Sequence, residues 1–214
     1  EMCIRDRSDI MMPVMNGITM CKILKEDVRT SHIPIILLTA KDSLQDKEEG
    51  YQVGADSYLT KPFSATLLHS RINNLLESRK RLTERFNTST PHHNMDEKRA
   101  LLAESLNKLD NEFIEKINQL IEARLSSEKI DIGYLADNMC MSKSTLYRKM
   151  KALTGLSTNE YVRKIKMQHA ERLLLEGRYN ISEVAFRVGI NSVVYFRQCF
   201  KEEFGVLPSE YLKQ

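Results

Sequence analysis

The chain has 214 residues, of which 42% are hydrophobic and 29% charged, a composition typical of a soluble globular protein. Its longest apolar run, residues 33–40, contains Pro34 and is far shorter than the roughly 20 residues of a membrane-spanning helix, so we expect a cytoplasmic chain. Residues 121–214 carry 15 Lys and Arg against 11 Asp and Glu, whereas residues 1–120 carry 17 against 18, which favours a polyanion as partner of the C-terminal part.

The first 86 residues alternate predicted strands and helices. A short continuous apolar run at 35–38 indicates a buried strand, and a second strand is expected at 57–59. Helical spacing of apolar residues occurs in three segments, 17–27, 43–53 and 64–86. This alternation predicts a parallel α/β sheet with right-handed connections.

Three polar residues stand directly after predicted strands, where ligands gather in parallel sheets: Asp9, Thr39 and Lys61. They lie in the strings SDIMMPVMNG, LTA and YLTKPF, which begin at residues 8, 38 and 58. In order and spacing these strings resemble the receiver domain of response regulators. The resemblance implies a partial flavodoxin-like fold over residues 1–86, with the front strands missing, and a cis peptide bond before Pro62.

The resemblance also assigns roles to these residues. Asp9 is the implied acceptor of a phosphoryl group from a histidine kinase, with Mg²⁺ bound by Asp9 and the carbonyl of Met11. Lys61 supplies positive charge, Thr39 a hydroxyl, and Tyr58 the aromatic switch that rotates inward. Three of these residues have simpler interpretations: Asp9 as a helix cap, Thr39 as a strand-end threonine and Tyr58 as a core aromatic.

The sequence departs from the receiver pattern at its front. About fifty residues, with two strands and an acidic pair of the metal site, are expected before Asp9, and charged residues 5–7 stand where an apolar strand is expected. Residues 1–7 are therefore not expected to be native sequence. We expect a destabilised receiver remnant with an exposed edge strand, which binds Mg²⁺ poorly without its missing part.

Polar, turn-rich residues 87–94 indicate a linker, which we extend to residue 109. Within it His92 and His93 lack a third ligand nearby, and we interpret them as linker rather than as a metal site. The four cysteines are scattered, which predicts free thiols. Residues 110–125 then form an amphipathic helix that either docks onto the following domain or mediates dimerisation.

The pattern of residues 131–161 recurs at 180–211. The matched pairs are Ile132/Ile181, Ala136/Ala185 and Met141/Ile190 at an offset of 49, then Leu146/Phe196, Met150/Phe200, Gly155/Gly205, Glu160/Glu210 and Tyr161/Tyr211 at an offset of 50. A one-residue insertion in the turn accounts for the change of offset. Each copy predicts a short helix, a turn and a second helix, the arrangement of a helix-turn-helix.

The second half resembles the AraC-type family of transcriptional regulators. The string FGVLPSEY at 204–211 matches its C-terminal signature and MSKSTLYRKM at 141–150 its first recognition helix. The domain is assigned to 110–214, with its core at about 125–214, and the resemblance implies two recognition helices in successive major grooves, roughly 34 Å apart. The predicted DNA-binding residues are Ser144, Tyr147, Arg148 and Lys151 in the first copy, Arg163 and Lys164 between the copies, and Ser192, Val193, Arg197, Gln198 and Lys201 in the second.

Together the resemblances predict a sequence-specific DNA-binding transcriptional regulator under phosphorelay control. Its expected partners are double-stranded DNA, a histidine kinase in cis or in trans, and a second copy on DNA, without a small-molecule substrate. It is not expected to be an enzyme, although the intact protein is either a response regulator or a membrane-tethered hybrid kinase. The alternatives are a constitutive DNA-binding protein whose receiver remnant binds proteins, a phosphotransfer catalyst without nucleic-acid function, and an all-helical adaptor.

Overall fold

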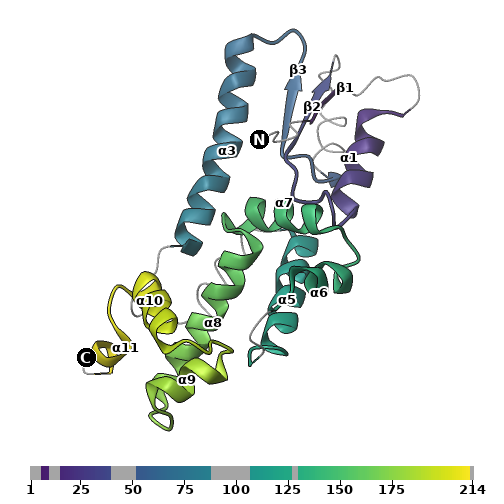
Figure 1. Ribbon diagram of the computed structural model, residues 1–214. Helices are drawn as coiled ribbons and strands as arrows, with labels where there is room; N and C mark the ends of the chain where they lie inside the picture. Colours follow the sequence, from purple (N-terminus) through teal and green to yellow (C-terminus); the bar gives the residue numbers. More distant parts are fainter. Residues whose placement is uncertain (1–5, 10–14, 40–51, 88–106, 127–129, 213–214) are drawn as a thin grey trace. The chain divides into compact units, whose positions relative to one another are not determined.

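The computed structural model describes residues 6–9, 15–39, 52–87, 107–126 and 130–212 (Figure 1). Contacts divide the chain into two units, Glu1–Thr83 and Glu84–Gln214. The boundary falls near the end of a long helix, a few residues before the predicted linker. Most of that linker, including His92 and His93, lies outside the described residues, as does most of the helix predicted at 43–53.

The first unit contains a parallel sheet, as predicted. Its strands β1 (Asp6–Asp9), β2 (Ile35–Thr39) and β3 (Ser57–Thr60) lie in the order β1-β2-β3, so that β1 is an edge strand of the described sheet. Two helices of this unit are described, α1 (Gly17–Glu26) and α3 (Ala65–Asn87). The predicted α/β class and the strands and helices that lie within the described residues are confirmed.

Alternation along the strands gives the sheet two apolar faces. Ile35, Leu37 and Tyr58 pack with Cys21 of α1, whereas neighbouring side chains of the same strands pack with Leu68 of α3. Successive side chains of a strand point to opposite faces, so both faces need a helix to cover them. The apolar run at 35–38 follows from burial on both sides.

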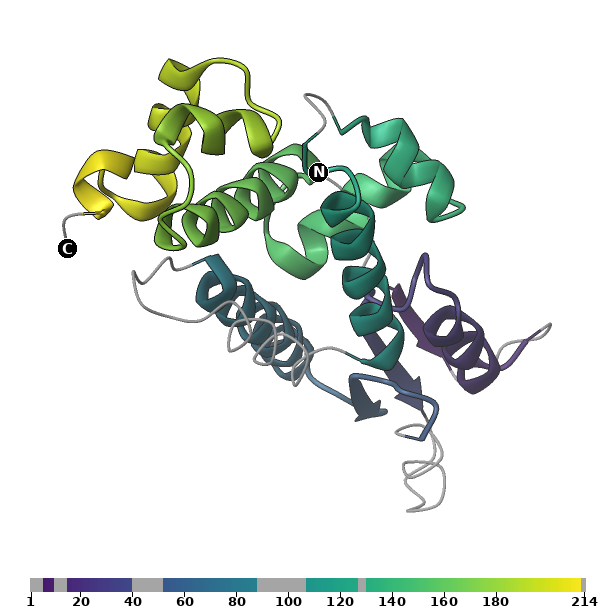
Figure 2. The same ribbon diagram turned by 90° about the horizontal axis from the view of Figure 1, so that it is seen from below.

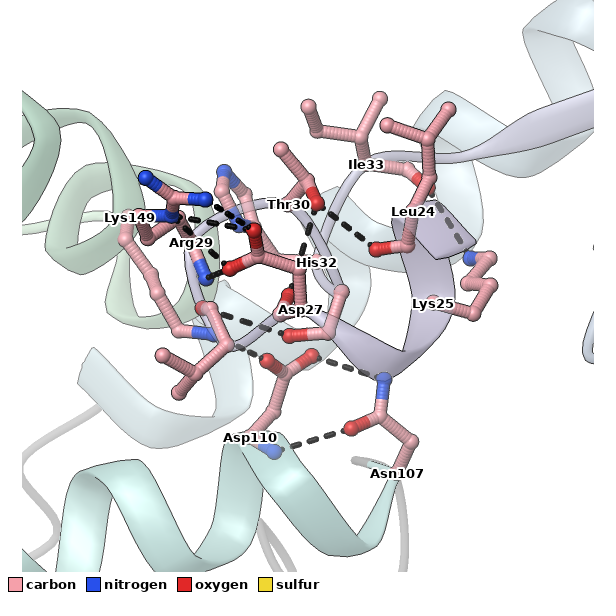
Figure 3. Close-up of polar contacts among 12 residues, drawn as sticks. Leu24, Lys25, Asp27, Arg29, Thr30, His32, Ile33, Asn107, Asp110 and Lys149 are labelled. Carbon is pink, nitrogen blue, oxygen red and sulfur yellow. Dashed lines mark hydrogen bonds and ion pairs between the residues drawn. The ribbon is translucent and has the colours of Figure 1, made fainter. Parts of the chain in front are cut away.

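The half-buried carboxylate of Asp56 ties α1 to the start of β2. Lys25 Nζ lies 2.7 Å from Asp56 Oδ2. It also donates to the Ile33 carbonyl at 2.9 Å (Figure 3). The same Asp56 oxygen accepts from the Ile35 backbone N–H at 2.8 Å. This network satisfies polar groups at the point where the chain enters the sheet, where an unpaired buried group would be costly.

The second unit is entirely helical in its described part (Figure 2). Its helices are α5 (Lys108–Glu122), α6 (Ile132–Asn138), α7 (Lys143–Thr154), α8 (Thr158–Leu175), α9 (Ile181–Arg187), α10 (Val193–Phe204) and α11 (Pro208–Tyr211). The central helix α8 contacts α5, α7, α9 and α10. None of the described helices has the length and apolar character needed to cross a membrane.

The predicted duplication is confirmed. Helices α6 and α9 begin 49 residues apart, and α7 and α10 begin 50 apart. Both turns contain a residue with positive φ, Cys140 and Gly189, and both close with a hydrogen bond back to the alanine in the first helix of the pair. The extra residue of the second turn is Asn191, because Ile190 still matches Met141.

Capping explains where the second helix of each pair begins and ends. Ser142 accepts a hydrogen bond from the Thr145 N–H and Ser192 one from the Tyr195 N–H. Gly155 and Gly205 close the two helices with φ of 75° and 77°, a left-handed conformation that favours glycine. The two helices are therefore twelve residues long each.

Helix α5 docks onto the first repeat through a buried ion pair (Figure 3). Lys149 Nζ lies 2.6 Å from Asp110 Oδ1, and both side chains are almost fully buried. Asn107 caps the helix by accepting from the Asp110 N–H and donates to the other carboxylate oxygen at 3.0 Å. Asn118 accepts from the Tyr161 hydroxyl at 2.8 Å, which joins α5 to α8. Docking onto the following helices, one of the two predictions for this segment, is confirmed.

Replacing Asp110 with alanine tests the importance of this pair. We expect Asp110→Ala to lower the free energy of unfolding by about 3–5 kcal/mol, because Lys149 loses the carboxylate that balances its buried charge. Urea denaturation followed by circular dichroism measures the change. The matched control adds Lys149→Met, which removes the buried cation that lost this carboxylate and should recover most of the loss. Equal losses in both variants would show that the carboxylate does not act through Lys149.

Candidate nucleic-acid interface

Helix α7 presents one polar face to solvent. Its buried side is formed by Leu146, Met150 and Leu153. The opposite side carries the four residues predicted from the sequence, all exposed: Ser144, Tyr147, Arg148 and Lys151. Tyr147 is 49% exposed, unusual for a large aromatic side chain. This face combines hydrogen-bond donors, acceptors and cations on a helix slim enough for a major groove.

Helix α10 presents a second such face. Phe196, Cys199 and Phe200 are buried. The exposed set comprises the predicted Ser192, Arg197, Gln198 and Lys201, together with Val194 and Tyr195. Both repeats therefore bury the apolar side of the second helix and expose the polar side.

Val193 and Val194 differ in exposure. The Val193 side chain is partly buried and packs against the core of the second repeat, whereas Val194 is 76% exposed. Position 193 precedes the buried Phe196 by three residues, which places both on one side of a helix. That spacing was visible in the sequence. Val194 therefore joins the candidate interface, and DNA contact by Val193 stays a prediction.

The prediction for Lys164 is wrong. Its side chain is buried, and its Nζ lies 3.1 Å from Glu203 Oε1 of α10. It therefore holds α8 against α10 instead of facing a polyanion. The neighbouring Arg163 remains exposed and pairs with Glu202 at 3.4 Å. Glu203 is 39 residues away along the chain, so local sequence carries no signal of the buried pair.

The first unit gathers its predicted residues at one edge of the sheet. Asp9 ends β1, where it pairs in register with Leu38, and Thr39 ends β2. Lys61 follows β3, and its N–H donates to the Thr39 carbonyl at 2.6 Å. The Thr39 side chain is buried and that of Lys61 is exposed. Residues up to 52 positions apart in the chain thus meet at the carboxyl ends of three adjacent strands.

Tyr58 lies inward. Its ring belongs to the core beside α1, and its hydroxyl is buried without a hydrogen-bond partner in the described part of the chain. The peptide bond between Lys61 and Pro62 is cis, as the resemblance implied. An inward tyrosine is compatible both with the switch and with the simpler interpretation as a core aromatic.

Two family models match the chain, a response regulator receiver domain over residues 7–73 and a helix-turn-helix domain over residues 135–214. The chain thus matches a receiver domain followed by a helix-turn-helix domain, and the second match covers the part that resembles the AraC-type family. The first unit holds the receiver match and the second unit the helix-turn-helix match, in agreement with the folds described above.

Two curated proteins are similar to this chain over different lengths. Histidine kinase P4 of Formosa agariphila is 36% identical over 204 residues, which are 95% of this chain and 14% of that protein. The DNA-binding dual master transcriptional regulator RpaA of Synechocystis is 42% identical over 76 residues, 36% of this chain and 32% of RpaA. The chain thus spans less than half the length of either protein.

A solved structure also aligns with the second half. The C-terminal domain of AraT, a response regulator from Geobacillus stearothermophilus, is 31% identical, with a TM-score of 0.44, over 47% of this chain and 84% of that chain.

The AraC-type signature at 204–211 has a structural role in this domain. Gly205 ends α10, Pro208 begins α11, and the Tyr211 hydroxyl donates to Glu171 of α8. Burial, followed by the hydrogen bond and charge of Glu171, raises the pKa of Tyr211, so the hydroxyl stays protonated and can donate. The signature fastens the end of the chain to α8.

The described part of the receiver domain does not form a complete metal site. No group of three His, Cys, Asp or Glu side chains suited to a metal lies together among the described residues, and Met11 is outside them. Mg²⁺ at Asp9 and Met11 therefore remains a prediction, and we derive no chemical step through it. Of the described cysteines, Cys21, Cys140 and Cys199 are free thiols, as predicted.

The correction at Lys164 leads to a stability test. Lys164→Ala is expected to lower the free energy of unfolding by about 1–3 kcal/mol, because Glu203 is left partly buried without its cation. Arg163→Ala is the matched control: its ion pair is exposed, and we expect a change below about 1 kcal/mol. Thermal denaturation of both variants compares them. Equal losses, or a larger loss for Arg163→Ala, would contradict the assignment.

Proposed function

We propose that this chain is the DNA-binding output part of a two-component signalling protein, a sequence-specific transcriptional regulator under phosphorelay control. The observation that carries the proposal is the duplicated, capped helix with a buried apolar side and an exposed polar and cationic side, α7 and α10. A helical adaptor needs no such matched pair of cationic faces. Two faces of this kind are suited to two segments of one duplex.

The exposed side chains fall into two groups, those suited to base edges and those suited to phosphates. Ser144, Arg148 and Gln198 carry side chains that hydrogen-bond to base edges, and Val194 offers a methyl-sized apolar contact. Lys151, Lys201 and Arg163 provide flexible or peripheral positive charge for phosphates, which positions the protein without reading sequence. At twelve residues, each recognition helix is about 18 Å long, enough to follow a groove over several base pairs.

DNA binding is tested by two substitutions on the same helix. If Arg148 contacts guanine, Arg148→Ala should reduce the free energy of binding to the preferred DNA sequence by about 1–3 kcal/mol. It should also relax the base preference at one base pair. Lys151→Ala should instead weaken specific and random DNA alike and reduce the salt dependence, because it removes a phosphate contact. Gel shifts at several salt concentrations measure both. Equal losses of affinity for specific and random DNA in Arg148→Ala would show that Arg148 does not recognise a base.

Control by phosphorylation is proposed for the intact protein. The support is the convergence of Asp9, Thr39 and Lys61 on one edge of the sheet and the inward Tyr58 behind it. In the proposal a phosphoryl group on Asp9 is stabilised by the hydroxyl of Thr39 and the positive charge of Lys61. The inward position of Tyr58 then alters the surface of the domain. The response is dimerisation on DNA, where paired modules bind repeated sites with higher avidity.

The charged start of β1 favours a second candidate, a constitutive DNA-binding protein whose receiver remnant is not phosphorylated. Asp6 and Arg7 stand in an edge strand that receivers make apolar. In this alternative the remnant serves only as a surface for protein partners, and DNA affinity is independent of phosphodonors.

Labelling separates the two candidates. In the chain extended by the residues encoded upstream of Glu1, a radiolabelled small phosphodonor with Mg²⁺ should label the protein, and Asp9→Asn should abolish the label while Asp6→Asn retains it. The label marks an acyl phosphate, which hydroxylamine releases. Unchanged labelling in Asp9→Asn, or normal dimerisation and DNA binding by that variant, would exclude the phosphorelay and leave the constitutive regulator.

A further inference from the structure

The two recognition helices expose different chemistry at equivalent positions. At the offset of 50 that relates α7 to α10, the exposed pairs are Ser144/Val194, Tyr147/Arg197, Arg148/Gln198 and Lys151/Lys201. Of these four pairs only the last is conserved in type between the copies, and lysine is a phosphate-binding residue; the exposed caps that precede the helices, Ser142 and Ser192, are identical. Every pair suited to base edges differs, although the backbone of the two helices is capped in the same way.

Positions 148 and 198 differ in the base that they select. The guanidinium of arginine donates two hydrogen bonds to O6 and N7 of guanine, whereas the amide of glutamine donates to N7 and accepts from the N6 amino group of adenine. Both side chains are exposed. The equivalent place in the two helices is therefore built for guanine in α7 and for adenine in α10.

Val194 strengthens the difference. It precedes Gln198 by four residues, so both lie on one side of α10 about one turn apart. With 76% of its surface exposed, it has the largest exposed fraction among the large hydrophobic residues described as exposed. A partner that covers this side chain would remove apolar surface from water. A thymine methyl group in the major groove is such a partner. The matched residue of α7 is Ser144, which offers only a hydroxyl.

A glutamate fixes the amide of Gln198. Gln198 Nε2 donates to Glu202 Oε1 at 3.2 Å, and Glu202 also pairs with Arg163 of α8 at 3.4 Å. This contact uses one amide hydrogen and leaves the other hydrogen and the carbonyl oxygen for a base. The residue of α7 that matches Glu202 is Ala152, so Arg148 has no carboxylate one turn further along its helix. Glu202 is a positioning residue for adenine recognition.

We propose that the two helices read unlike subsites: α7 selects a G·C pair through Arg148, and α10 selects an A·T pair at the equivalent step through Gln198, next to a thymine that contacts Val194. The inference rests on the proposed DNA binding. It predicts a target with a fixed polarity, since exchanging the two subsites presents each helix with the wrong base. The ligand is B-form DNA with a guanine subsite on one side and an A·T subsite on the other.

The central experiment exchanges the proposed base-contacting residues, Arg148 and Gln198, between the two helices. The purified chain selects duplexes from a library with two randomised segments, and the recovered sites should contain two unlike subsites. Arg148→Gln should change guanine to adenine in one subsite only. Gln198→Arg combined with Glu202→Ala gives α10 the residues of α7 at these two positions and should change adenine to guanine in the other subsite. In both cases the relative affinity for the two bases should change by roughly 5- to 150-fold.

The outcomes are distinguishable. Two identical subsites, or variants that still bind DNA and keep the wild-type base preferences, would overturn the inference while leaving DNA binding intact. Failure of the wild-type chain to bind any duplex would instead overturn the proposed function. Melting temperatures close to wild type confirm that the exposed substitutions have left the fold unchanged.

Two smaller changes test Val194 and Glu202 separately. Replacing the thymine of the A·T subsite with deoxyuridine removes one methyl group; it should weaken the wild-type chain several-fold and leave Val194→Ser unaffected. Glu202→Ala alone should reduce discrimination for adenine in the α10 subsite without changing the guanine preference of α7. Equal sensitivity of wild type and Val194→Ser to deoxyuridine, or unchanged adenine discrimination in Glu202→Ala, would contradict the assigned contacts.

Discussion

The packing of α8 is the constraint on which the second unit depends. This helix buries side chains around most of its circumference, among them Tyr161, Ile165, Met167 and Leu174, and it contacts both repeats. A capping box between Ser157 and Glu160 fixes its start. With 18 residues it is about 27 Å long and stiff, so it sets the separation of α7 and α10. The proposed recognition of two DNA segments requires that separation to be constant.

Buried lysines secure the helices around α8. Lys149 pairs with Asp110, Lys164 with Glu203, and Lys166 Nζ donates to the Gly189 carbonyl in the second turn at 3.4 Å. Each joins segments far apart in sequence, and breaking a buried pair is costly even where the pair itself adds little net stability. Three of the cations that make residues 121–214 basic therefore belong to the interior. The exposed cations on α7 and α10, together with Arg163, remain available to DNA.

Much of this architecture could be predicted because it follows from the local spacing of apolar residues. The strand at 35–38, the duplicated helix pairs and the exposed faces of α7 and α10 follow from apolar spacing and caps. Lys164 could not be placed this way, because α8 is buried on several sides and has no single apolar stripe that defines an outer face. The partial burial of Val193 follows from its spacing to Phe196. The edge of the sheet where Asp9, Thr39 and Lys61 converge was predictable from strand order, but the surroundings of Asp9 depend on segments distant from it in sequence.

The spacing dependence of DNA binding tests the account most directly. Each base pair inserted between the two subsites moves them about 3.4 Å apart and rotates one by roughly 35° relative to the other. Because α8 cannot stretch or twist to follow, insertion of one to three base pairs should reduce affinity to that of a duplex with a single subsite. Affinity that stays constant across these insertions would show that the two readers move independently, and it would contradict the role given to α8.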